Sequence, residues 1–393
     1  MLHAISIPAH VRLPCPVRDE DSMGLTAADL PPMVEALRAR IGQKYELEQV
    51  NRLITSDIIA RYALGVGDDN PLFCEPEYAA STPFGRVIAP PTFLATVARS
   101  RPQGLRGVHA LFAGLRIEFQ RPVCEGDRLK SITALDSLEE KQGKYSGTSY
   151  IQQNVTTHSN GDELVATATS YSFRTLRDEA RERGKYQALT RKTYSADEIA
   201  EIKQKYLDEV KARRGSGLLD LSQVKVGDEL PSLIKGPLSV ADVICWLNGV
   251  GAGVFIKSSR QWYEYLNRHP AAGMVDEYGV PDAPECVHWD ERIAKKIGMP
   301  GPYDYGWQRC AWLGHLVTDW IGDRAWVQQI KIELRAPNYV GDLTTLTGSV
   351  TSVDPDAKSL TVQMQAVDHR GRLTAKGEAR VVTDVPHLGA AHV

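Results

Sequence analysis

The residues of this 393-residue chain that could carry out acid–base chemistry lie close together in its C-terminal half. His288 is followed by Asp290, and two further carboxylates, Asp282 and Glu285, precede it by a few residues. An imidazole can both accept and donate a proton near neutral pH. Gly306 opens a segment with helical periodicity, and a free N–H at a helix start can stabilise a developing negative charge. A packed structural histidine and a simple helix-start glycine are the alternative interpretations.

Other site chemistries find little support in the sequence. His288 and Asp290 offer two potential metal ligands without a clear third, so we predict no metal site. The glycines of residues 249–253 follow an expected helix, whereas a dinucleotide-binding glycine loop follows a strand. The sequence contains no GxxxxGK[ST], HExxH or GxSxG motif. Phosphate-loop, zinc-protease and serine-hydrolase chemistry are therefore not indicated.

Composition and charge limit the environment and the partners. The formal net charge of −3 gives no general attraction to nucleic acid or to an anionic membrane, so neither is an expected partner. No stretch is long and apolar enough to span a membrane, and the N-terminus has no apolar signal-peptide core. The six cysteines are scattered without a CxxC pair, which is typical of thiols in a reducing compartment. We expect a soluble, cytoplasmic protein.

An internal repeat organises the chain. Residues 115–122 read LRIEFQRP and residues 330–337 read IKIELRAP; both are followed by a Gly-Asp pair, at a constant offset of 215 residues. Upstream, DIIARYALGVG at 57–67 matches ADVICWLNGVG at 241–251 with an offset of 184. The difference of 31 residues indicates an insertion in the second half, at about 252–282. We interpret the chain as a duplicated unit.

Each half is predicted to contain a capped helix. Ser56, Asp57 and Ser239 are expected helix starts, because their side chains can accept hydrogen bonds from free N–H groups. Apolar positions with helical periodicity follow in both copies, and Gly67 and Gly251 are expected to end these helices.

Strands are predicted to complete each half. Apolar and polar residues alternate in 115–119, 330–334 and 359–367, which indicates sheets with one buried face. Residues 160–162 and 369–371 are expected hairpin turns. The predicted fold class is α+β, with a helix packed on a long antiparallel sheet in each half.

A charged segment separates the halves. Ser195 and Glu198 form an expected capping box, and the helix is predicted to run to about Arg214. Its acidic and basic residues are interspersed, which is typical of a solvated linker helix and not of a nucleic-acid-binding arm. The predicted domains are an N-terminal unit at 1–175, a charged helical linker at 176–217, and a C-terminal unit at 218–393 with the insertion at about 252–282.

Four segments resemble MaoC-like (R)-specific enoyl-CoA hydratases and dehydratases. GDDNPL at 67–72 is similar to the start of the family's GDxNPLHxD signature, and HWD at 288–290 resembles its HxD end. IGMPGPYDYG at 297–306 is similar to the family's GPIAHG segment, and P-x-x-x-G-D at 337–342 resembles a family turn. The resemblance covers both copies and leaves out the linker and the insertion.

The resemblance implies a double hotdog fold, in which each half wraps a curved antiparallel sheet around a helix and the two sheets pair within one chain. Residues 57–67 and 241–251 are the expected central helices. Family members add or remove water across the 2,3 double bond of a thioester of coenzyme A or acyl carrier protein. Their site consists of a His, an Asp five residues before it, and a Gly N–H.

The two halves retain this site unequally. In the first half, Phe73 stands at the His position and Pro91, which has no N–H, stands at the Gly position. Asp68 and Asn70 remain, and we interpret them as turn or cap residues. In the second half His288 and Gly306 stand in register, so the resemblance assigns the chemistry to that half.

One part of the family site is missing from the second half. The Asp position is Ala283 when counted from His288 and Ala252 when counted from the preceding helix. The insertion lies between these two positions, and we expect Asp282 or Glu285 to replace the missing acid. Asp290 is expected to act as a cap or as a group that supports the site indirectly, and not as the acid. The predicted catalytic residues are therefore His288, Gly306, Asp282 and Glu285.

The expected function is the (R)-specific hydration or dehydration of a 2-enoyl or 3-hydroxyacyl thioester in fatty or carboxylic acid metabolism. The expected partner is an acyl-CoA substrate, with coenzyme A or acyl carrier protein as part of the substrate and no other cofactor; a homodimer is an expected assembly. A hotdog thioesterase and a non-catalytic acyl-CoA-binding subunit are the alternatives. Aromatic residues of the insertion either wall an acyl pocket or pack against one another: Phe255, Trp262, Tyr263, Tyr265 and Tyr278.

Overall fold

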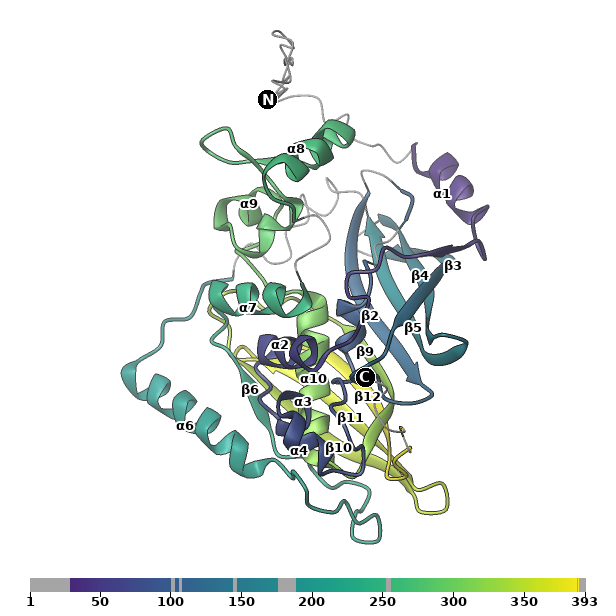
Figure 1. Ribbon diagram of the computed structural model, residues 1–393. Coiled ribbons are helices and arrows are strands. Elements are labelled where there is room, and N and C mark those ends of the chain that lie inside the picture. The colour runs from purple at the N-terminus through teal and green to yellow at the C-terminus, as the bar shows by residue number, and fades with distance from the viewer. Residues whose placement is uncertain are drawn as a thin grey trace, which may run out of the picture.

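The computed structural model describes residues 29–99, 103–105, 108–143, 147–175, 189–251, 256–386 and 388 (Figure 1). Cys15, Ala252 and Phe255 lie outside these ranges. Its main feature is one antiparallel sheet in the order β1-β3-β4-β5-β2-β9-β12-β11-β10-β6. These strands are β1 (Lys44–Glu46), β2 (His109–Phe119), β3 (Leu129–Gly143), β4 (Gly147–Asn160), β5 (Glu163–Thr175), β6 (Leu233–Lys235), β9 (Trp326–Leu334), β10 (Thr344–Asp354), β11 (Ser359–Asp368) and β12 (Leu373–Val382).

Helices cover the sheet and fill its connections. Those of the N-terminal half are α1 (Leu30–Arg38), α2 (Ser56–Val66), α3 (Pro71–Cys74), α4 (Pro76–Ala80) and the 3₁₀ helix η2 (Phe93–Thr96). The later ones are α6 (Ala196–Ala212), α7 (Val240–Val250), α8 (Ser259–Arg268), η3 (Pro270–Ala272), η4 (Pro284–His288), α9 (Glu291–Lys296) and α10 (Gly306–Ile321). None of the described helices is long and apolar enough to cross a membrane.

The two halves meet where β2 pairs with β9, and the repeat seen in the sequence determines this junction. Arg116 lies opposite Lys331, and these two residues are equivalent in the repeat. On one side Leu115 pairs with Ile332, and the equivalent pair of Ile117 with Ile330 lies on the other. A local two-fold axis therefore passes between Arg116 and Lys331. All four apolar residues are buried, which confirms the predicted alternation.

The repeated helices α2 and α7 pack against each other across this axis. Both have eleven residues, and both end at a left-handed glycine, Gly67 or Gly251. A Cβ built on Gly65 would lie 2.8 Å from the carbonyl oxygen of Cys245. A Cβ built on Gly249 would lie 3.2 Å from the Cα of Gly65. Since Gly65 and Gly249 are themselves equivalent in the repeat, the repeated glycine is what lets the two helix backbones approach.

The expectation that α2 and α7 are the central helices is wrong. The helix that contacts the face of β9, β10, β11 and β12 is α10, and 14 of its 16 residues are buried. Figure 1 shows α2 and α7 lying across α10, which runs along the yellow-green strands. The sequence pattern did not reveal this because α10 buries polar residues that find partners inside the protein. The equivalent position in the N-terminal half holds the single-turn helix η2.

Caps and turns follow the sequence closely. Ser239 and Ser195 cap their helices through capping boxes with Asp242 and Glu198, as predicted. Helix α2 is capped by Thr55, one residue before the predicted start. The Thr55 side chain accepts a hydrogen bond from the Ile58 N–H at 3.2 Å. Both predicted hairpin turns connect neighbouring strands, β4 to β5 and β11 to β12.

The linker helix α6 ends against the C-terminus of α10. Arg213 Nε donates to Asp319 Oδ1 at 2.8 Å, and Arg214 Nε donates to the carbonyl oxygen of Trp320 at 2.5 Å. Positive side chains at a helix C-terminus bind its free carbonyl groups and favour its dipole. The linker is therefore held at one end by ionic contacts with the buried helix.

Candidate functional site

His288 lies at the end of η4 and is held in one protonation state. Its Nδ1 is 2.8 Å from the carbonyl oxygen of Tyr303. Because a carbonyl oxygen only accepts, Nδ1 carries the ring proton and Nε2 is left with a free lone pair. Burial lowers the pKa of His288 to about 4, so the ring is neutral at physiological pH. Tyr303 and Tyr305 flank the ring, with ring-centroid distances of 4.6 and 3.8 Å.

Gly306 begins α10 directly after Tyr305. A Cβ on Gly306 would lie 2.6 Å from Leu334 Cδ1 and 2.8 Å from Phe112 Cδ1, so only glycine fits here without displacing side chains. This packing places the positive end of the α10 dipole next to the His288–Tyr305 stack. The Tyr305 hydroxyl is buried and has no hydrogen-bond partner among the described residues. Burial raises its pKa, so the group remains a donor.

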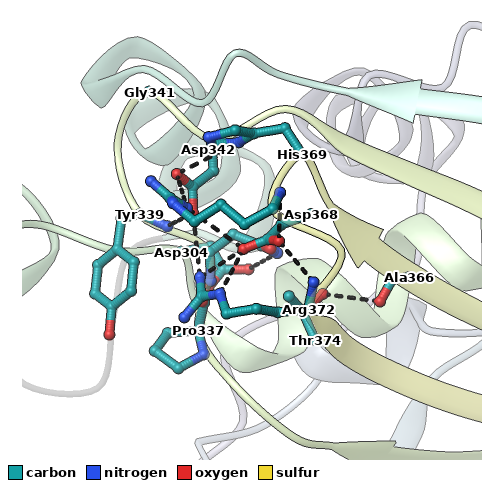
Figure 2. A network of polar contacts seen from close by, with 12 residues as sticks. Asp304, Pro337, Tyr339, Gly341, Asp342, Ala366, Asp368, His369, Arg372 and Thr374 are labelled. Atoms are coloured by element: carbon teal, nitrogen blue, oxygen red, sulfur yellow. Dashed lines mark hydrogen bonds and ion pairs between the residues drawn. The ribbon is translucent and has the colours of Figure 1, made fainter. Parts of the chain in front are cut away.

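Asp304 is adjacent in sequence to this helix start but is bound elsewhere. Arg309 Nε donates to it at 2.8 Å, and Asn338 donates through its backbone N–H at 3.1 Å and its side chain at 3.0 Å. Figure 2 shows Asp304 in a polar network with Asp342, Asp368 and other residues. With both oxygens engaged, this carboxylate holds the turn together and is not free to transfer protons.

The carboxylates predicted to replace the missing acid differ in their surroundings. Asp282 is exposed and lies in the short strand β8 (Pro281–Asp282). Its Oδ1 accepts a hydrogen bond from the Ala283 N–H at 2.7 Å. Glu285 lies close enough to Tyr305 for its charge to contribute to the raised pKa of that phenol. Asp290 accepts from the N–H groups of Arg292 and Ile293, so its predicted role as a helix cap is confirmed.

The insertion packs against itself. Trp262 and Tyr265 stack with centroids 5.8 Å apart and form a small cluster with Ala283, separate from the main core. Tyr263 and Tyr278 are exposed. Of the two interpretations of these aromatic residues, the described ones support packing within the insertion and not the wall of an acyl pocket.

The equivalent positions of the N-terminal half form an apolar cleft. Phe73 and Pro91, which correspond to His288 and Gly306, both line it. The cavity within it is small, about 30 Å³, and Ile321 and Trp326 of the C-terminal half also line it. None of the predicted catalytic residues lines this cleft. The described side chains at the degenerate position thus pack around a small apolar space and supply no groups for acid–base chemistry.

Asp68 makes the predicted Asx turn, and it also belongs to a buried cluster that the sequence did not reveal. Its Oδ1 accepts from the Asn70 N–H at 3.1 Å. The same oxygen lies 3.5 Å from His315 Nε2, and Glu209 Oε1 and Asp319 Oδ2 lie 3.4 and 3.3 Å from that nitrogen. Only the four-residue spacing of His315 and Asp319 on one helix could have indicated part of this cluster.

A family model matches the N-terminal half, and two sequence relatives match part of the chain. Residues 39–168 match the model described as "FAS1-like, dehydratase domain region". A protein of Streptomyces avermitilis named "UPF0336 protein" is 29% identical over 118 residues, which is 28% of this chain and 76% of that protein. A Streptomyces griseus protein of the same name is 28% identical over 118 residues.

Solved structures match the chain over both halves. A "MaoC-like dehydratase" is 22% identical with a TM-score of 0.63, covering 88% of this chain and 100% of that one. A putative MaoC domain protein dehydratase from Chloroflexus aurantiacus is 14% identical with a TM-score of 0.54, covering 89% and 96%. A conserved hypothetical Mycobacterium tuberculosis protein described as having a double hotdog fold is 14% identical with a TM-score of 0.53, covering 87% and 96%.

These comparisons define the fold. The chain has the double hotdog fold of the MaoC-like dehydratases, and residues 39–168 match a FAS1-like dehydratase region. The fold that the sequence resemblance implied is thereby confirmed.

Proposed function

We propose that the protein catalyses the (R)-specific hydration of a 2-enoyl thioester of coenzyme A, or the reverse dehydration of the 3-hydroxyacyl thioester. Coenzyme A is part of the substrate in this reaction, and no further cofactor takes part. The (R)-stereochemistry and the thioester substrate come from the family resemblance. We further propose that the chain acts in the cytoplasm as a homodimer.

The observation that carries this proposal is the state of His288. Its Nδ1 proton is directed to the Tyr303 carbonyl group, and burial lowers its pKa to about 4. The ring therefore presents Nε2 as an unprotonated base at neutral pH.

Hydration then follows from simple proton movements. His288 Nε2 accepts a proton from water as the water oxygen bonds to C3 of the thioester. The π electrons of the 2,3 double bond shift toward the carbonyl group, and negative charge develops on its oxygen. A proton is delivered to C2 to complete the addition. Dehydration reverses these steps on the 3-hydroxyacyl thioester.

The developing charge needs hydrogen-bond donors. In this proposal the Gly306 N–H, at the start of α10, is one donor to the thioester oxygen. The Tyr305 hydroxyl is a second, because it is buried beside His288, stays protonated, and has no partner within the described part of the chain. A preorganised buried donor costs no rearrangement when the charge appears.

Glu285 is the carboxylate we assign to the second proton. It precedes His288 by one turn of η4, and its charge acts on the Tyr305 ring that stacks on His288. Asp282 is exposed and already accepts a backbone hydrogen bond, so we rank it second. In this assignment Glu285 accepts the proton that His288 takes from water and delivers it to C2, so both groups return to their starting protonation states.

The test is to mix the purified full chain with a 2-enoyl-CoA and follow loss of the conjugated thioester absorbance. Loss of absorbance without release of free thiol, together with a 3-hydroxyacyl-CoA product of (R) configuration, would support the proposal. Release of free thiol would indicate a thioesterase instead. Saturable binding of the acyl-CoA without turnover would indicate a non-catalytic binding subunit.

A further inference from the structure

The cluster around His315 is buried and belongs to neither proposed catalytic half-site. The His315 side chain is fully buried, and those of Asp68, Asp319 and Glu209 are 2%, 6% and 9% exposed. The residues come from three separate segments: the loop after α2, the buried helix α10 and the linker helix α6. Buried charged groups need partners or a bound ion to offset the loss of hydration.

The charges within the cluster do not balance. Three carboxylates, those of Asp68, Glu209 and Asp319, face the guanidinium of Arg213 and the amine of Lys235, and Arg213 also binds the exposed Asp69 at 2.5 Å. Lys235 Nζ lies 2.9 Å from His315 Nδ1 and 3.0 Å from the Gly67 carbonyl oxygen. Binding of a metal by His315 Nε2 requires the ring proton on Nδ1, so in the metal-bound form Lys235 is a neutral amine that accepts this proton's hydrogen bond. The formal charge that remains is negative, so the interior favours one more positive charge.

Unused ligand atoms point into the same space. His315 Nε2 and Asp319 Oδ2 are buried and make no hydrogen bond to any described residue. One atom each from Asp68, His315 and Asp319 lies within 4.8 Å of the other two. The contacts of Nε2 with Asp319 and Asp68, at 3.3 and 3.5 Å, are long for hydrogen bonds. They match the distance of about 3.3–3.5 Å between two donors of a tetrahedral metal with bonds of about 2.0–2.15 Å.

From this geometry we propose that Asp68, His315 and Asp319 bind a divalent transition-metal ion, with Glu209 as the nearest further donor. One imidazole nitrogen and carboxylate oxygens in a tetrahedral arrangement are a ligand set that suits Zn²⁺. The ion is structural: it joins the N-terminal half, the C-terminal half and, through Glu209, the linker helix. It is not adjacent in sequence to His288 or Gly306, and the proposed hydration does not use it.

A titration with metal alone tests this proposal. The full chain is treated with a chelator, desalted, and titrated separately with Zn²⁺ and Co²⁺. We expect one ion per chain by elemental analysis, intense visible absorption from tetrahedral Co²⁺, and a higher thermal midpoint with Zn²⁺. Failure to bind either ion at a one-to-one ratio would overturn the proposal and leave a shared proton as the balancing charge.

Variants separate this site from adventitious binding. The Asp68→Asn variant keeps an oxygen that can accept from the Asn70 N–H, so it should fold. Asp68→Asn and His315→Gln should each lower the affinity for Co²⁺ at least about tenfold. His288→Ala removes the other candidate ligand and should leave Co²⁺ affinity unchanged. Circular dichroism in chelator checks that each variant is folded. Equal Co²⁺ binding by wild type and both cluster variants would overturn the assignment.

Discussion

The two halves of the molecule share a fold and differ in what their equivalent positions can do. Where the C-terminal half has His288 and Gly306, the N-terminal half has Phe73 and Pro91, which can neither transfer a proton nor donate an N–H. Where one has the buried helix α10, the other has the single turn η2. The small apolar cleft that Phe73 and Pro91 line is shared with residues of the C-terminal half and contains no acid–base group.

Features that remain symmetric are those that hold the fold together. Asp127 accepts from the Cys124 N–H and Asp342 from the Tyr339 N–H, both at 3.0 Å, so the repeated Gly-Asp turns are built alike. The crossing of α2 and α7 is symmetric as well. The comparison shows that both halves have retained the equivalent packing contacts, whereas only the C-terminal half has retained the candidate acid–base residues.

The largest effect should come from removing the base of the C-terminal half. We expect His288→Ala to lower kcat/KM for 2-enoyl-CoA hydration by about 10²–10⁴-fold, the usual contribution of an acid–base group. His288→Asn should be similarly inactive, although its amide can still donate to the Tyr303 carbonyl oxygen. Asp68→Asn, in the other half, should change turnover little. A larger loss from Asp68→Asn than from His288→Ala would reverse the assignment of the halves.

Gly306→Ala should have the next largest effect. The new methyl group would press on Leu334 and Phe112, so we expect a loss of about 1 kcal/mol in the free energy of unfolding. Displacement of the helix start should also lower kcat/KM by at least about tenfold. Gly301→Ala is the matched control, because a Cβ there has no neighbour within 4 Å among the described residues. Equal kinetics for the two variants would argue against a role for the Gly306 N–H.

The two carboxylates near His288 allow a sharper test of the active half. Glu285→Gln should lower kcat by about tenfold or more, because it removes a proton carrier with little change in shape. Asp282→Asn keeps an oxygen for the Ala283 N–H and should retain the wild-type rate. The opposite ranking in steady-state assays would move the acid to Asp282, and wild-type rates for both variants would remove the carboxylate from the mechanism.

The smallest effect expected is on the pH dependence. Because burial lowers the pKa of His288 to about 4, kcat/KM should stay level as pH falls through 6.5 and decline only near pH 4. The unfolded chain binds a proton on this ring below about pH 6.5 and the folded chain does not. Folding stability from this group is therefore full above pH 6.5 and is lost as pH falls toward 4. Burial also lowers the pKa of His158, in the N-terminal half, to about 4. This residue should add the same trend in stability without affecting kcat/KM. An acid limb of kcat/KM near pH 6.5 would contradict the buried state of His288.

Much of this architecture was determined by the sequence itself. The repeat of LRIEF and IKIEL predicted two strands, and their offset of 215 residues places Arg116 opposite Lys331 at the centre of the sheet. Caps, hairpin turns and strand faces are local, because they depend on residues a few positions apart. The difference between Phe73 and His288 is likewise visible without any coordinates.

Tertiary structure alone decided which helix lies at the centre and which polar groups meet there. The pattern of 57–67 is a strong helix signal, yet α10 is the more deeply buried helix, because partners from distant segments satisfy its polar side chains. Asp68, Glu209 and His315 are more than a hundred residues apart at each step, so no local spacing could bring them together. Local sequence determines how a segment folds, whereas the distance between two such groups depends on the packing of the whole chain.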